Sequence, residues 1–109
     1  MTTITITKSS DGSYKQIECN GHAGFAKYGE DIVCAAISVL TINTINSVEK
    51  FTDDKVRVSQ DEEKGILRLE FEGVPSEEAK LLLKSFELGV TSIYDQYGKK
   101  FLNIKFRRE

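Results

Sequence analysis

Cysteine and histidine are scarce in this chain, and it has no excess of positive charge. Two cysteines in 109 residues are too few for a disulfide scaffold. The net charge of −2 gives no general basic surface for nucleic acid, and we interpret the short basic stretch at 105–109 as a solvated terminus. No signal peptide is recognisable, and the longest uncharged run, 32–48, is too short to span a bilayer. We therefore expect a cytoplasmic protein with reduced thiols, without direct nucleic-acid or membrane partners.

The remaining composition is that of an ordinary folded chain. The sequence is 39% hydrophobic and 29% charged, which argues against disorder. It contains no internal repeat, linker or low-complexity segment. The length suits one domain, so we expect residues 1–109 to form a single domain.

Alternation of apolar and polar residues predicts about five strands. The first alternates Thr with Ile, and the turn at Asp11-Gly12 separates it from the second, so we expect the two to form a hairpin. A charged turn at 61–65 separates the third from the fourth, and the fifth lies near the end of the chain. The expected strands lie at about 2–8, 13–19, 56–58, 67–71 and 102–106.

Helical spacing predicts two helices. The first, at about 32–50, is apolar on two sides, so we expect it to be buried against more than one element. The second begins after Ser76 as N-cap, is amphipathic over 79–97 and ends at Gly98. The order ββαββαβ predicts an α+β fold with two helices on one face of a mainly antiparallel sheet.

The residues best suited to catalysis lie between positions 21 and 40. They hold the only histidine, His22, and one of the two cysteines, Cys34. We expect Asp31 at the helix N-cap and Cys34 in the first turn, where unpaired N–H groups and the helix dipole favour thiolate over thiol. His22 lies within a glycine-rich loop and is suited to take the thiol proton. This is the pattern of a Cys–His nucleophile, with His22 as general base.

Two other interpretations of these residues remain open. A buried free cysteine often acts only as a small hydrophobe, so the cysteine and the histidine would be structural. Cys19, His22 and Cys34 would supply three zinc ligands, with Asp31 as a fourth, but the spacing lacks the paired second half of known zinc motifs. Cys19 is better explained as a strand residue that faces the core. We therefore expect no metal and no cofactor.

The motif pair resembles a known family. The segments GHAG at 21–24 and GEDIVCAA at 29–36 closely resemble the ribosomal-processing cysteine protease family, called Prp. The resemblance covers nearly the whole chain in length and in element order. It implies an endopeptidase, without cofactor, that removes a short N-terminal extension from the precursor of large-subunit ribosomal protein twenty-seven. The family's catalytic residues fall on His22 and Cys34, and its conserved aspartate and serine fall on Asp31 and Ser38.

The resemblance leaves two local roles open. Asp31 either caps the helix or orients His22 as a third catalytic member. Ser38 lies one turn beyond Cys34 on the same face, where it supports the thiolate or the loop, or simply bonds back to the helix backbone.

The loop before the helix is the expected substrate loop. Gly21, Gly24 and Gly29 bracket Phe25 and Tyr28, so we expect it to close over the substrate and to bring His22 toward Cys34. The alternative is a preformed dyad under a loop that is already packed.

Assembly and function each have an alternative as well. The resemblance implies a homodimer, and the apolar surface that would be completed by the second copy is expected at Tyr94, Tyr97, Phe101 and Phe106. The rival function is a non-catalytic ribosome-assembly module that binds the same ribosomal partner without cutting it.

Overall fold

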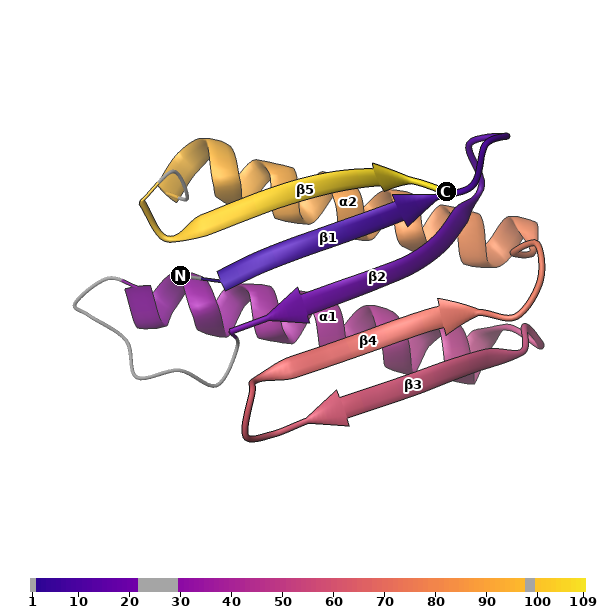
Figure 1. Cartoon of the computed structure of the whole chain (residues 1–109), viewed down its shortest axis with the longest axis horizontal. Helices are drawn as coiled ribbons and strands as arrows, with labels where there is room; N and C mark the ends of the chain where they lie inside the picture. The colour runs from indigo at the N-terminus through magenta and orange to yellow at the C-terminus, as the bar shows by residue number, and fades with distance from the viewer. Residues whose placement is uncertain (1, 22–29, 98–99) are drawn as a thin grey trace.

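The chain folds into a five-stranded sheet with two helices, in the predicted order ββαββαβ (Figure 1). The computed structural model describes residues 2–21, 30–97 and 100–109. The strands are β1 (Thr2–Lys8), β2 (Tyr14–Asn20), β3 (Val56–Asp61), β4 (Ile66–Phe71) and β5 (Leu102–Arg108). The helices are α1 (Glu30–Phe51) and α2 (Glu77–Tyr97).

The sheet has the strand order β3-β4-β2-β1-β5. Neighbouring strands are antiparallel except β1 and β5, which run parallel with Thr2 opposite Leu102 and Lys8 opposite Arg108. This confirms the expected mainly antiparallel sheet. The parallel pair follows from the topology, because α2 carries the chain back along the sheet before β5 begins.

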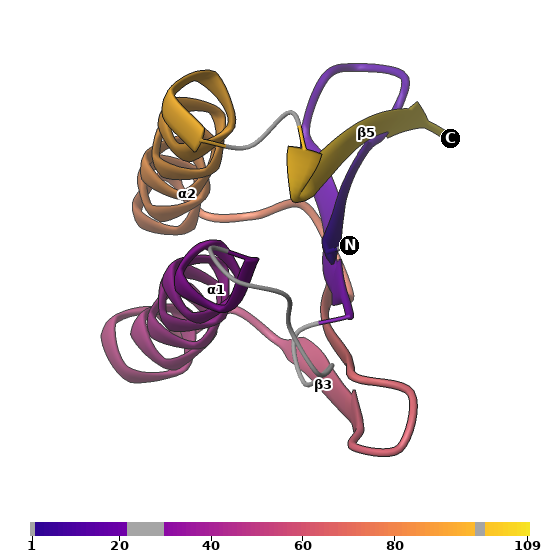
Figure 2. The same ribbon diagram turned by 90° about the vertical axis from the view of Figure 1, so that its left-hand side faces the viewer.

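Both helices cover the same face of the sheet, as predicted (Figure 2). Alternation along each strand sends one set of side chains toward the helices, and these side chains form the core with the inner faces of α1 and α2. The most fully buried of the large apolar residues are Ile4, Ile6, Ile17, Leu69, Ile37, Val48, Leu83, Phe86, Val90 and Leu102.

The outer side of α1 is more exposed than its sequence predicts. Val33 and Ile37 are buried, but Ile32 and Val39 are 73% and 65% exposed. The expectation that α1 is buried against more than one element is confirmed, since its inner face packs on both the sheet and α2, but its outer side stays open to solvent. The helix has only the sheet and α2 to pack against, and two neighbours cannot cover its full circumference.

Helix α1 is longer than the uncharged run at 32–48, because it continues past that run through Glu49 and Lys50 to Phe51. Residues Ile32–Phe51 therefore form a helix long and apolar enough to cross a membrane by length and composition, which the length of the uncharged run alone did not indicate. Its inner face packs against the sheet, as in the core helix of a folded domain.

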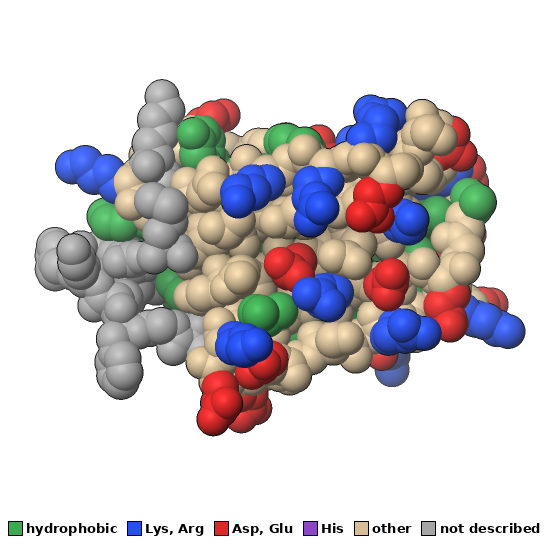
Figure 3. Space-filling model, in the orientation of Figure 1, with side chains coloured by type: hydrophobic (Ala, Val, Ile, Leu, Met, Phe, Trp, Pro, Cys, Tyr) green, Lys and Arg blue, Asp and Glu red, His purple; other side chains and the backbone are tan. Residues whose placement is uncertain are grey.

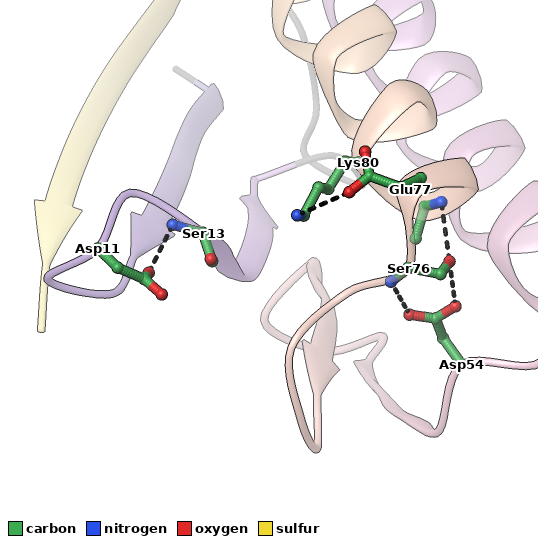
Figure 4. A network of polar contacts seen from close by, with 7 residues as sticks. Asp11, Ser13, Asp54, Ser76, Glu77 and Lys80 are labelled. Atoms are coloured by element: carbon green, nitrogen blue, oxygen red, sulfur yellow. Dashed lines mark hydrogen bonds and ion pairs between the residues drawn. The ribbon is translucent and has the colours of Figure 1, made fainter.

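Turns and caps connect the elements at the end opposite α1's first turn (Figure 4). Asp11 accepts hydrogen bonds from Ser9 Oγ at 2.6 Å and Ser13 N at 2.9 Å, which closes the β1–β2 turn. Ser76 is the N-cap of α2, as predicted, because Ala79 N donates to its Oγ at 3.1 Å. Ser76 N in turn donates to Asp54 at 2.8 Å, which ties the start of α2 to the end of α1.

The other face of the sheet carries charges of both signs (Figure 3). Arg68 on β4 donates to Glu18 on β2 through Nε at 2.9 Å and Nη2 at 2.6 Å. Arg57 on β3 pairs more loosely with Glu70, at 3.9 Å. The visible face thus alternates blue and red without a broad basic area.

Candidate functional site

The site lies at the end of the sheet where β2 stops. Gly21 follows β2 with φ of 97°, in the left-handed region that glycine alone adopts readily. Its N–H donates to the Gly65 carbonyl at 2.8 Å, and Gly65, in the β3–β4 turn, also has positive φ. The sequence analysis assigned Gly65 only to a charged turn, and nothing in the pattern indicated that it holds Gly21.

Helix α1 brings Cys34 to this same point. The Cys34 thiol donates to the Gly21 carbonyl at 3.5 Å, and Thr2 Oγ1 donates to the same oxygen, also at 3.5 Å. The Cys34 residue is only 7% exposed. The thiol is therefore fixed between the start of α1 and the ends of β1 and β2.

Cys34 lies slightly deeper in α1 than predicted. The helix begins at Glu30, two residues before the expected start, so Asp31 belongs to the first turn and is not the N-cap residue. Two acidic residues are favourable at the positive helix end, which explains why the helix extends through them. Because helical side chains lean toward the N-terminus, the Cys34 side chain still lies over the first turn. The side chains of Glu30 and Asp31 lie outside the described part of the structure.

Cys19 is a core residue, as predicted. It is fully buried on the helix-facing side of β2, opposite Ile4 on β1 and Leu67 on β4. Burial raises the pKa of the Cys19 thiol to about 12, while a hydrogen bond with Thr41 acts in the opposite direction and the neighbouring Cys34 raises it further. Cys19 therefore stays protonated under physiological conditions and is unsuited to act as a nucleophile.

A polar line on α1 runs inward from Cys34. Thr41 is fully buried and donates to the Ile37 carbonyl at 2.8 Å, a bond back to the backbone of its own helix. Ser38 differs: among the described residues, its Oγ is the buried side-chain polar atom that has no hydrogen-bond partner. A buried hydroxyl without a partner is costly, so this oxygen next to the Cys34 turn calls for an explanation.

The remaining predicted site residues lie outside the described ranges. These are the base His22 and the loop residues Gly24, Phe25, Tyr28 and Gly29. The structure thus brings Cys34 and Gly21 together and places Ser38 four residues further along α1, and it does not test the pairing of His22 with Cys34. Within residues 2–21, 30–97 and 100–109, no group of three or more His, Cys, Asp or Glu side chains is placed to hold a metal ion.

Volume alone does not identify this site. A hollow of about 580 Å³ lies at the opposite end of α1, lined by residues that include Phe51, Asp54 and Val74. Its polar groups are used structurally, since Asp54 bonds Ser76. The chemistry of the thiol and its neighbours, rather than the size of a hollow, marks the Cys34 end as the candidate active site.

The chain is similar to known cysteine proteases. The sequence profile of the family described as cysteine protease Prp matches residues 1–102. The ribosomal processing cysteine protease Prp of Staphylococcus aureus is 27% identical over 106 residues, which cover 96% of this chain and all of that protein. The Bacillus subtilis protein of the same name is 29% identical over 101 residues, covering 89% of this chain and 90% of that one.

Solved structures agree with the fold. The crystal structure of the S. aureus protease with a substrate peptide superposes with a TM-score of 0.87 at 25% identity, and each chain is covered completely. A Streptococcus mutans protein superposes with a TM-score of 0.88 at 30% identity, with 100% of this chain and 99% of that one covered.

Proposed function

Because the chain belongs to the cysteine protease Prp family, we propose that this protease removes the N-terminal extension of the precursor of large-subunit ribosomal protein twenty-seven. Cys34 is the nucleophile in this proposal and His22 is the general base. The protein acts in the cytoplasm as a single domain of residues 1–109, without a cofactor. The observation that carries the proposal is the position of the Cys34 thiol, 3.5 Å from the Gly21 carbonyl, beside the first turn of α1.

That position suits each step of peptide cleavage. His22, the residue after Gly21, takes the thiol proton, and the thiolate attacks the scissile carbonyl carbon to form a tetrahedral oxyanion. The positive end of the α1 dipole lies beside the thiol, and it is suited to stabilise this oxyanion. Collapse releases the amine with a proton from His22 and leaves an acyl-enzyme, which water then hydrolyses. A relative from S. aureus has been crystallised with a covalently linked product peptide, which supports a covalent route.

The test is cleavage of the precursor by matched cysteine variants. Cys34→Ala should abolish cleavage and keep the melting temperature, whereas Cys19→Ala should retain cleavage although it leaves a cavity in the core. Mass spectrometry of the cut precursor gives the bond that is broken. Cleavage by Cys34→Ala at the wild-type rate would refute the assignment.

A non-catalytic ribosome-assembly module remains the rival function. Such a module would bind the precursor and release it uncleaved. Binding by wild-type protein with no cut product under reducing conditions would favour the rival, and it would leave the position of Cys34 without a use.

Ser38, Asp31 and the substrate loop complete the proposal. Ser38 Oγ donates to the thiolate or to the closed loop once substrate is bound, which would give that buried hydroxyl its missing partner. Asp31 acts in the first turn, either on the helix end or on His22. The loop of Gly21, Gly24 and Gly29 closes over the peptide and places Phe25 or Tyr28 against it.

We also infer that two copies associate through the exposed side of the helices. Ile32 and Val39 on α1 and Leu81 and Leu88 on α2 are 65–73% exposed. This surface differs from the one expected from the sequence. Of the four residues expected there, Tyr97 and Phe106 are exposed, whereas Tyr94 and Phe101 pack against the core. Light scattering at micromolar concentration should show a dimer that Leu88→Glu dissociates and Gln96→Glu, on the same helix, does not. A wild-type monomer would contradict the inference.

A further inference from the structure

A second feature of α1 lies beyond Cys34, toward the C-terminal half of the helix. A cleft of about 220 Å³ opens between α1 and the edge strand β3, whose positions can be followed in Figure 2. Ile45 and Leu67 form its floor and are 4% and 6% exposed. Ile42 and Val58 form its walls and are 44% and 40% exposed. The cleft is therefore apolar inside and open to solvent.

The size of the cleft suits one apolar side chain. A cavity of about 150 Å³ lined by aliphatic side chains stays dry and holds a benzene-sized molecule. The cleft exceeds that volume, and the amides of Asn46 and Gln60 at its rim offer donors and acceptors to a peptide backbone. The Glu49 carboxylate at one end of the cleft repels an acidic residue in any peptide segment that binds there. The lining thus selects an apolar side chain on a neutral or basic segment.

The cleft and Cys34 share one helix. Ile42 and Ile45 lie eight and eleven residues after Cys34, which at the helical rise corresponds to about 12–17 Å along α1. An extended peptide covers that length with about four or five residues. A peptide bound across Cys34 therefore reaches the cleft with a residue four or five positions from the scissile bond.

The edge of β3 supplies a matching backbone. Among the described strands, β3 pairs only with β4. Glu72 N donates to the Lys55 carbonyl, and facing residues alternate along an antiparallel pair, so the backbone groups of Val58 and Gln60 point away from β4. In a peptide strand that pairs with β3, the residues opposite Val58 and Gln60 place their side chains on the same side of the sheet as those two residues. The cleft lies on that side.

We propose that this cleft is a specificity subsite of the protease. It binds an apolar side chain of an extended substrate segment that pairs with the edge of β3, about four or five residues from the bond that Cys34 attacks. The proposal rests on the proposed protease function. It explains why α1, which carries the nucleophile, leaves an apolar cleft open against an edge strand rather than closing it.

The test places a bulky side chain in the cleft by a substitution on α1. Asn46→Phe places a ring at the rim, and Asn43→Phe is the matched control, since Asn43 is exposed on the same helix and does not line the cleft. The probe is a quenched fluorescent peptide that spans the precursor's extension and cut site. Each residue three to six positions from the cut, on either side, is changed in turn to Asp. Melting temperatures check that each variant is folded.

We expect one apolar position at a distance of four or five residues to dominate. Its change to Asp should raise KM of the wild-type enzyme and of Asn43→Phe about tenfold, a usual discrimination for an apolar pocket. Asn46→Phe should show this raised KM already with the parent peptide, and its kcat should stay within about twofold of the wild-type value. Placing Asp at the dominant peptide position should then raise the KM of this variant little further. Val58→Phe repeats the test from the strand, with Ser59→Phe, on the opposite face, as its control.

The outcomes separate the two proposals. If the wild-type enzyme leaves the parent peptide uncut, the protease function fails and the subsite fails with it. If the wild-type enzyme cuts and Asn46→Phe and Val58→Phe keep the wild-type KM, only the subsite is refuted. A dominant peptide position at three or six residues from the cut, with none at four or five, also refutes it.

Discussion

Ser38→Ala should stabilise this protein and slow its chemistry. The Ser38 Oγ is buried without a hydrogen-bond partner, and such a group costs about 1–3 kcal/mol. Alanine removes that cost and is a better helix former by about 0.5 kcal/mol. The loss of packing around one oxygen offsets part of the gain. We therefore expect the free energy of unfolding to rise by at least about 1 kcal/mol.

Ser47→Ala is the matched control on the same helix. Ser47 is partly exposed, and its hydroxyl is not among the buried ones that lack a partner. This control gains only the helix propensity, so Ser38→Ala should exceed it by about 1 kcal/mol, or about 4 °C in melting temperature. Thermal and urea unfolding of both variants measure the difference.

The activity of the same variant should move in the opposite direction. If Ser38 donates to the thiolate or to the closed loop with substrate bound, kcat/KM for the precursor peptide falls about tenfold or more, the usual value of a bond to a charged group. A melting temperature at or below that of Ser47→Ala would refute the reasoning about stability. A stabilised Ser38→Ala with full activity would refute the supporting role.

Four further outcomes follow from the structure and the proposals. His22→Ala should lose about 10²–10⁴-fold in cleavage rate with an unchanged melting temperature, and an equal loss of both would indicate a structural histidine. Iodoacetamide should label Cys34 before Cys19, which burial keeps protonated, and mass spectrometry of the labelled protein would show the reverse order if the assignment is wrong. The unfolded chain ionises Cys19 above its ordinary pKa of 9.0 while the folded thiol keeps its proton up to about 12, so stability should fall with rising pH in that interval. The slope is about 1.4 kcal/mol per pH unit, it should be shallower in Cys19→Ala, and equal slopes would contradict this origin. Amide hydrogen exchange over residues 21–30 should slow when an uncleavable peptide binds, and strong protection in the free protein would rule out loop closure.

Strand alternation and helix caps were readable from the sequence because each is a local signal. The Thr-Ile repeat of β1 and the Ser76 cap of α2 depend on nearby residues, and both are confirmed. The helix start at Glu30 was placed two residues too late, because acidic residues suit both an N-cap and a first turn.

Longer-range features were not readable in the same way. No local signal indicates that Gly65 accepts a hydrogen bond from Gly21, or that the outer side of α1 remains exposed. The cleft beside β3 depends on strand order, which pairs β4 with β2 and leaves β3 at the edge. The position of Cys34 was predictable because a motif marks it, whereas its contact with the Gly21 carbonyl needed the fold.

The parallel pairing of β1 with β5 has a consequence for biosynthesis. Residues 2–8 are synthesised well before residues 102–108, so one side of β1 stays without its partner until β5 has been made. During that interval the nascent chain exposes a long strand edge, which is a template for pairing with another copy. Synthesis of β5, rather than completion of the helices, therefore closes the sheet. A chain that lacks residues 102–109 would keep its helices and its thiol and would be expected to swap strands or aggregate.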